Sequence, residues 1–296
     1  MIMDQEITPI TDSENKSKPI NVLAIDQTLR KYRMKQPFKI LTDIWGVLIP
    51  YQFRTELYRY IDEHLYDYIL VNYHKPEVYS FIVDLVRRTM EDRTKYPQMP
   101  MIGLDDCCDD QQTKVRTICE NLQYRRMQTA DSLLNDGIDT IYNQVWSEGY
   151  RTKQLRPPLF SDVMRNFAKW HTDPYYIKIY TFASGPIDSQ RLFLSASTEG
   201  DVTQYLISGF DAHSYYKYDW TKFQAVIASL GERIPANLFY FTDSPTKGRS
   251  AARAGITTFI IKREGNRKYR PKDLELFTTI DSLDQFDFVP LDHCGC

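Results

Sequence analysis

Two short apolar runs in this chain end in the same pair of residues, a threonine followed by an aspartate. One run occupies residues 38–43 and the other residues 238–243, so Asp43 and Asp243 each follow a pattern typical of a buried strand. Charged residues seldom end a buried strand unless they are paired or bind a cation. We therefore expect the two carboxylates to converge on one crevice of a sheet, and this requirement limits the folds that the chain can adopt.

Strands and helices alternate after Pro157 and Pro158. Alternation of this kind predicts right-handed βαβ units and a parallel sheet. Strands are predicted at 176–182, 238–242 and 256–261, and helices at 160–170, 188–195, 222–230 and 248–254.

Residues 51–150 have a different pattern, in which apolar side chains recur at helical spacing. These helices interrupt the chain between the first predicted strand and the rest of the sheet. The predicted fold class is therefore α/β, with a Rossmann-like parallel sheet core and an all-helical cap inserted after the first strand. The acidic stretch around Cys107 and Cys108 is interpreted as a solvated turn between cap helices, and a metal-binding loop is the alternative.

The domain boundaries follow from these patterns. The α/β core is predicted at 38–50 and 151–285, with the helical cap at 51–150. Residues 1–37 are polar and include a basic run, which we interpret as a flexible leader; an address signal or an anion-binding patch is the alternative. Residues 286–296 are predicted to form a C-terminal tail, and its paired cysteines, Cys294 and Cys296, do not make a lipidation box.

Charge and composition narrow the function. The chain has 37 Lys and Arg against 39 Asp and Glu, a net charge of −2, which disfavours bulk binding of nucleic acids. No apolar stretch approaches the roughly 20 residues that span a bilayer. Five cysteines do not indicate a disulfide framework. We expect a monomeric cytoplasmic protein, with the nucleus as a second location, that binds a small phosphorylated substrate rather than a nucleic acid or a membrane.

Ligands of an open parallel sheet bind beyond the carboxyl ends of its strands. Besides the two aspartates, Ser184 and Gly185 follow a predicted strand and precede a helix, where a hydroxyl and a backbone N–H suit a phosphate. Lys217 can supply a positive charge at the same place. Oxygen ligands alone suit Mg²⁺. Each residue also has a structural interpretation, as a turn, a helix cap or a surface charge.

These motifs resemble those of the haloacid dehalogenase-like phosphatases, and among them acireductone synthase, the enolase-phosphatase of methionine salvage. The resemblance is strongest between residues 146 and 266, and residues 38–50 match the first motif in position. The stretches that carry it are Trp146–Tyr150, Tyr180–Gly185, Ser189–Phe193, Ser197–Asp201, Gly209–Asp211, Lys217, Phe241–Asp243 and Arg263–Asn266.

The resemblance implies an aspartyl-phosphate mechanism. In such enzymes the first-motif aspartate, here Asp43, attacks the phosphorus atom and is then released by water. The resemblance also implies that Mg²⁺ is held by Asp43, by the backbone carbonyl of Trp45 and by Asp243. Lys217 would act as a catalytic and substrate-binding cation.

The implied phosphate loop is Ala183, Ser184 and Gly185, and the implied substrate is 2,3-diketo-5-methylthiopentyl-1-phosphate. The chain departs from the family pattern at two of its site residues. Trp45 stands where the family has a glutamate, and related phosphatases use an acid at this position for proton transfer, which commonly contributes about 10²–10⁴ in rate. Ala183 stands where the family has a phosphate-binding serine. Two functions therefore remain: an impaired phosphatase, or an inactive pseudophosphatase that binds a phosphorylated ligand or a protein partner.

Overall fold

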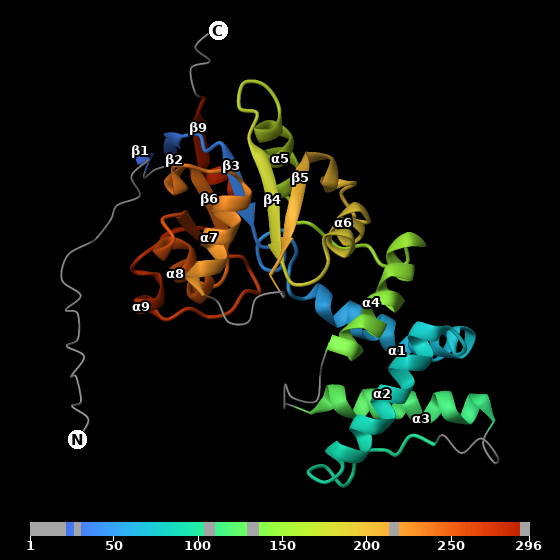
Figure 1. The fold of residues 1–296 in the computed structure, drawn as a ribbon. Helices are drawn as coiled ribbons and strands as arrows, with labels where there is room; N and C mark the ends of the chain where they lie inside the picture. Colours follow the sequence, from blue (N-terminus) through green and yellow to red (C-terminus); the bar gives the residue numbers. More distant parts are fainter. Residues whose placement is uncertain (1–21, 27–30, 104–109, 129–135, 213–218, 291–296) are drawn as a thin grey trace, which may run out of the picture.

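The computed structural model describes residues 22–26, 31–103, 110–128, 136–212 and 219–290. Within these residues the chain forms an α/β core and a helical unit beside it (Figure 1). The strands are β1 Val22–Asp26, β2 Lys31–Lys35, β3 Lys39–Thr42, β4 Lys178–Ala183, β5 Leu206–Asp211, β6 Leu238–Thr242, β7 Thr257–Ile261, β8 Thr278–Ile280 and β9 Phe286–Val289. The helices are α1 Phe53–Asn72, α2 Pro76–Asp92, α3 Gln111–Met127, α4 Asp136–Arg151, α5 Val163–His171, α6 Ile187–Ser195, α7 Trp220–Ser229, α8 Pro245–Arg253 and α9 Pro271–Leu274.

The larger sheet has the order β5-β4-β3-β6-β7-β8, and every neighbouring pair in it is parallel. Strand β3 lies between β4 and β6, with Thr42 beside both Thr181 and Phe241. The predicted Rossmann-like sheet is thereby confirmed. Strands β5 and β8 were not predicted, because polar and small residues interrupt their apolar runs.

Both faces of this sheet are buried, because successive strand residues point to opposite sides. Leu41, Tyr180 and Tyr240 pack against α7 and α8 in one cluster. Ile40 and Phe241 belong to a second cluster on the other face, which also contains residues of α5. Helices therefore cover the sheet on both sides, and a ligand can reach the sheet at the ends of its strands.

Helices α1 to α4 lie between β3 and β4 in the chain and form the predicted all-helical insertion (Figure 1). The apolar stripe predicted for the first of these helices is buried, at Leu57, Tyr60, Ile61, Leu65 and Ile69. The insertion packs against the core, since the same cluster of buried residues continues from one to the other. The Cys107 and Cys108 segment lies outside the described residues.

The predicted flexible leader is wrong for its second half. Residues 22–26 and 31–35 form strands β1 and β2, and β2 pairs in parallel with β9 in a small three-stranded sheet. The basic run hides an alternating strand pattern, in which Met34 is fully buried between exposed Arg33 and Lys35 neighbours.

The predicted C-terminal tail is corrected for the same reason. Residues 286–289, assigned to the tail, are strand β9, with Phe286 and Phe288 in the core. The alternation of apolar and polar residues in β9 is only four residues long, which is too short to distinguish it from a frayed end. Residues 1–21 and the Cys294 and Cys296 segment lie outside the described residues.

Candidate active site

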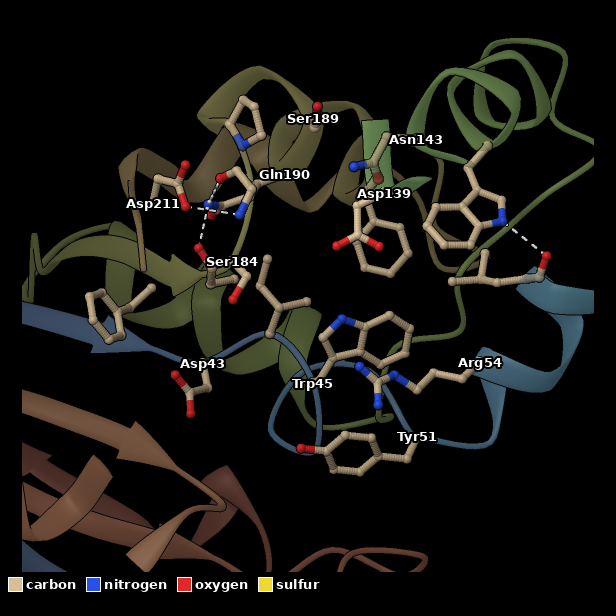
Figure 2. A pocket seen from close by; sticks show the side chains of 18 of the residues that line it. Asp43, Trp45, Tyr51, Arg54, Asp139, Asn143, Ser184, Ser189, Gln190 and Asp211 are labelled. Atoms are coloured by element: carbon tan, nitrogen blue, oxygen red, sulfur yellow. Dashed lines mark hydrogen bonds between the residues drawn. The ribbon is translucent and has the colours of Figure 1, made fainter. Parts of the chain in front are cut away.

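A cavity of about 950 Å³ opens at the carboxyl ends of β3, β4 and β6, between the sheet and the helical insertion. Its lining includes Asp43, Trp45, Ser184 and Asp243 from the core side, together with residues of α1 and α4 such as Arg54 and Asn143 (Figure 2). The sequence prediction that Asp43 and Asp243 converge on one crevice agrees with this arrangement.

The carboxylate of Asp43 is held by three donors. The Tyr240 hydroxyl donates to Oδ1 at 2.8 Å, and the Thr242 hydroxyl donates to Oδ2 at 2.6 Å. The ammonium of Lys247 also donates to Oδ2, at 3.1 Å. Because Asp43 is only 2% exposed, these contacts supply most of the stabilisation that water would otherwise give its charge.

Asp243 is the second buried carboxylate. The hydroxyl of Tyr51 donates to its Oδ2 at 3.2 Å, and the guanidinium of Arg267 lies 3.7 Å from the same oxygen. Burial raises the pKa of Asp243, and the negative charge of Asp43 raises it further. The pKa of Tyr51 is raised too, first by burial and then by the charge of Asp243. The two aspartates are therefore close enough for the charge of Asp43 to act on Asp243.

The turn after β3 brings these groups together. Gly46 has a φ of +73°, and a Cβ atom there would lie 2.7 Å from a ring carbon of Tyr51 and 2.9 Å from Cγ of Asp243. Only glycine gives both the left-handed backbone and the space. The side chain of Asn266 donates to the Gly46 carbonyl at 2.9 Å and fixes the turn from the end of β7.

Trp45 lies in the cavity wall, on the side where the helical insertion begins (Figure 2). Its ring stacks with Tyr51 at 6.2 Å between centroids and lies 5.5 Å from the ring of Phe193. The guanidinium of Arg54 lies 5.3 Å from the centre of the indole. The position two residues after Asp43 therefore faces the cavity with an indole and presents no carboxylate.

The predicted phosphate loop also lines the cavity, at Ala183, Ser184 and Gly185. The Gly185 N–H donates to Asp211 at 2.9 Å, so it is engaged with a side chain of the protein. The side chain of Gln190 donates to the carbonyls of Ala183 and Gly185 and holds the loop in this shape. Ser184 is exposed to the cavity and is the side-chain hydroxyl that this loop offers.

Lys217 lies outside the described residues, and the lysine seen beside Asp43 is Lys247. The sequence analysis missed Lys247 because it began the helix at Gly248. A serine followed by proline is a common start of a helix, and Ser244 accepts from the Lys247 N–H as its N-cap. That signal would have placed Lys247 in the first turn of α8, four residues after Asp243.

Several known proteins are similar to this chain along most of its length. No family model matches the chain. It is 26% identical over 248 residues to enolase-phosphatase E1 of a Synechococcus species, which covers 83% of this chain and 98% of that protein. It is 25% identical to enolase-phosphatase E1 of Xenopus tropicalis, over 84% of this chain and 94% of that one.

The chain resembles enolase-phosphatase E1. The similarity extends along almost the whole length of these relatives, so it includes both the sheet and the helical insertion. Among solved structures, the UTR4 protein of Saccharomyces cerevisiae superposes with a TM-score of 0.61 at 15% identity, over 84% of this chain and 99% of that one. The resemblance predicted from the sequence motifs is thereby confirmed, and the similarity to enolase-phosphatase E1 supports a hydrolase of the phosphatase class.

The structure adds one finding about membranes. Among the residues that it describes, no helix combines the length and apolar character needed to cross a bilayer.

Proposed function

We propose that this protein is a Mg²⁺-dependent phosphatase of the acireductone synthase type, with Asp43 as its nucleophile and 2,3-diketo-5-methylthiopentyl-1-phosphate as its substrate. The observation that carries the proposal is the place of Asp43. It follows the central strand β3, lines the cavity beneath the helical insertion, and has the ammonium of Lys247 at 3.1 Å.

The residues fit a magnesium ion. Mg²⁺ is commonly held by one or two carboxylates, with waters and substrate phosphate completing its shell. Asp43 and Asp243 are two such carboxylates, and both line the cavity. Burial raises the pKa of Asp243 and the charge of Asp43 raises it further, so a cation bound by both carboxylates would stabilise their charges. The described residues contain no group of three or more acidic, histidine or cysteine ligands. The backbone carbonyl of Trp45, implied by the family resemblance, would be the further protein ligand. When bound, the ion would offset the charge of the phosphate.

The side chains of the protein then have separate tasks. Tyr240 and Thr242 orient the Asp43 carboxylate, because each donates to one of its oxygens. Lys247 reduces the repulsion between this carboxylate and an incoming phosphate dianion. The Ser184 hydroxyl lies where it can donate to a phosphate oxygen, and Lys217 is proposed as a further cation.

We propose that activity is impaired at two positions. Trp45 offers no carboxylate for transferring a proton to the leaving oxygen, which commonly costs about 10²–10⁴ in rate. Ala183 lacks the hydroxyl of a serine, and losing one hydrogen bond to a charged phosphate costs about 1.5–3 kcal/mol. The proposed substrate is a small phosphorylated molecule, and one chain can bind it because α1, α4 and the core of the same chain line the cavity together. A monomer in the cytoplasm is part of the same proposal.

One observation favours a second candidate, a protein that binds a phosphorylated ligand without turning it over. The three donors on Asp43 already satisfy much of its hydrogen-bonding capacity, which makes the carboxylate a weaker nucleophile. Under this alternative, phosphate analogues would raise the melting temperature and no phosphate would be released.

The test is phosphate release from the diketo phosphate and from an aryl phosphate, with Mg²⁺ and with a chelator. The phosphatase requires Mg²⁺-dependent release by the wild type and background rates for Asp43→Asn. Asp188→Asn is the matched control, since Asp188 is exposed on α6 and does not line the cavity. Equal release by wild type and Asp43→Asn would refute the phosphatase.

A further inference from the structure

We propose that Asp43 retains the phosphoryl group it accepts, so that the protein accumulates as an aspartyl phosphate and turns over slowly. The protein would then act as an acceptor for phosphoryl groups from donors with acidic leaving groups. This inference rests on the proposed role of Asp43 as nucleophile. It concerns the second half of the reaction, in which water has to remove the phosphoryl group.

Among the described residues, the three side chains that form hydrogen bonds with the Asp43 carboxylate are donors. Tyr240, Thr242 and Lys247 each direct a proton at its carboxylate. The Thr242 hydroxyl also accepts from the Ser244 N–H at 3.0 Å, which leaves its own proton for Asp43. These groups can stabilise an anion, and as donors they are unsuited to taking a proton from water.

Two of the described acids that line the cavity accept hydrogen bonds from groups other than a bound water or substrate. Asp243 accepts from Tyr51 and lies beside Arg267, and Asp211 accepts from the Gly185 N–H. Asp139 lines the opposite wall with Asn143, on helix α4 (Figure 2). Trp45 lies two residues after Asp43 and lines the cavity, so a basic side chain at this position could act on a water molecule there. The indole of Trp45 cannot do so, because its nitrogen is only a donor.

The surroundings of Asp43 also favour a long-lived product. Its side chain is 3% exposed, and the Lys247 ammonium stands where it can pair with a phosphoryl dianion. The indole of Trp45, which packs with Tyr51 and Phe193, lines the same cavity as Asp43 and fills part of its wall. The low exposure of Asp43 and the bulk of the Trp45 indole both slow the approach of an activated water molecule.

The chemistry balances without a further reactant. A carboxylate oxygen of Asp43 bonds to phosphorus as the bond from phosphorus to the leaving oxygen breaks. An acidic alcohol or a carboxylic acid leaves as its anion and needs no proton. In the second step a water oxygen attacks phosphorus, the bond to Asp43 breaks, and the water proton needs an acceptor. The described surroundings of Asp43 support the first step better than the second.

The experiment mixes the wild-type chain and Mg²⁺ with excess p-nitrophenyl phosphate. We expect a burst of about one nitrophenolate per chain, followed by a much slower steady rate. Intact mass should show one added phosphoryl group, which hydroxylamine removes and which Asp43→Asn never acquires. Trp45→Glu should abolish the burst and raise the steady rate by about 10²–10⁴. Trp45→Phe, which keeps an aromatic ring and adds no base, should retain the burst.

The outcomes separate this inference from the proposed function. Linear release from the first turnover, without a phosphorylated chain, would overturn retention and leave the phosphatase intact. Loss of the steady rate in Asp139→Asn, with full turnover in wild type, would likewise overturn it by identifying a base. No release and no added mass would refute Asp43 as the nucleophile itself. The wild-type burst and mass decide the question even where a Trp45 variant fails to fold.

Discussion

Two buried aspartates in this protein accept hydrogen bonds from similar sets of donors. Asp43 accepts from Tyr240, Thr242 and the cation of Lys247. Asp162 accepts through one oxygen from the Ser282 hydroxyl, from the Leu283 N–H and from the guanidinium of Arg263 at 2.8 Å. Each carboxylate therefore has three donors, and in each case one of these is a cation.

The difference lies in what surrounds the pair. Asp43 and Lys247 line the cavity, whereas neither Asp162 nor Arg263 does. The side chains of Arg263 and Asp162 are 6% and 4% exposed, and Arg263 also donates to the backbone carbonyls of Asp281 and Val47. The sealed pair connects the start of α5 to the ends of β7 and β8. A buried ion pair thus has a structural role where it is sealed and becomes available for chemistry where it opens on a cavity.

The largest effect should come from the sealed pair. Arg263→Met leaves the Asp162 carboxylate buried without its cation, and breaking such a pair costs about 3–5 kcal/mol in the free energy of unfolding. Urea denaturation measures this loss. Arg165→Met is the control, because the exposed pair of Arg165 with Asp284 is worth about 0–1 kcal/mol. Similar losses in both variants would remove the distinction between sealed and exposed pairs.

A smaller effect, of a different kind, is expected at the open pair. Lys247→Met removes a charge-assisted contact of about 1.5–3 kcal/mol from the bound phosphate, which corresponds to roughly tenfold to a hundredfold in kcat/KM. The free energy of unfolding should fall less in Lys247→Met than in Arg263→Met. The reason is that Asp43 keeps two hydroxyl donors and borders the cavity. Phosphatase assays and urea denaturation on the same preparations test this. Lys262→Met, on the exposed pair with Asp281, should leave activity unchanged.

The smallest effect is expected at the exposed acid beside the sealed pair. The hydrogen bond from Arg165 lowers the pKa of Asp284 to about 2, with a further contribution from Asn166. A lowered pKa stabilises the fold above the unfolded pKa of about 3.9, and this contribution is lost as the pH falls towards about 2. Asp284→Asn should therefore destabilise by less than about 1 kcal/mol at neutral pH, because the side chain is 44% exposed.

Denaturation of wild type and Asp284→Asn at neutral pH and near pH 2 would measure this difference. The two proteins should converge at the acid end. A difference that grows as the pH falls would contradict the assigned direction of the pKa shift.

Much of the fold followed from local patterns. The apolar stripe of α1 and the strands that end at Thr42 and Thr242 were predicted because each pattern lies within one element. The small sheet of β1, β2 and β9 was missed, because β2 is joined to β9 across some 250 residues of chain and each strand is too short to be recognised alone.

The residues of the candidate site also include some that were predicted from the sequence and one that was missed. Asp43, Asp243, Ser184 and Gly185 were found because strand ends in a parallel sheet are recognisable from the sequence. Lys247 was missed because its partner is 204 residues away and because the helix that carries it was predicted to begin at Gly248, three residues after its actual start at Pro245.

By itself the sequence determined the layered sheet, the helical insertion and the meeting of two carboxylates, since alternation and spacing report which residues share an element and a face. Only the tertiary structure decided which cation lies beside Asp43, and that this pair opens on a cavity while the pair of Asp162 and Arg263 is sealed. The reason is physical: a contact between distant segments depends on the order of the strands and the packing around them, and no single segment encodes either.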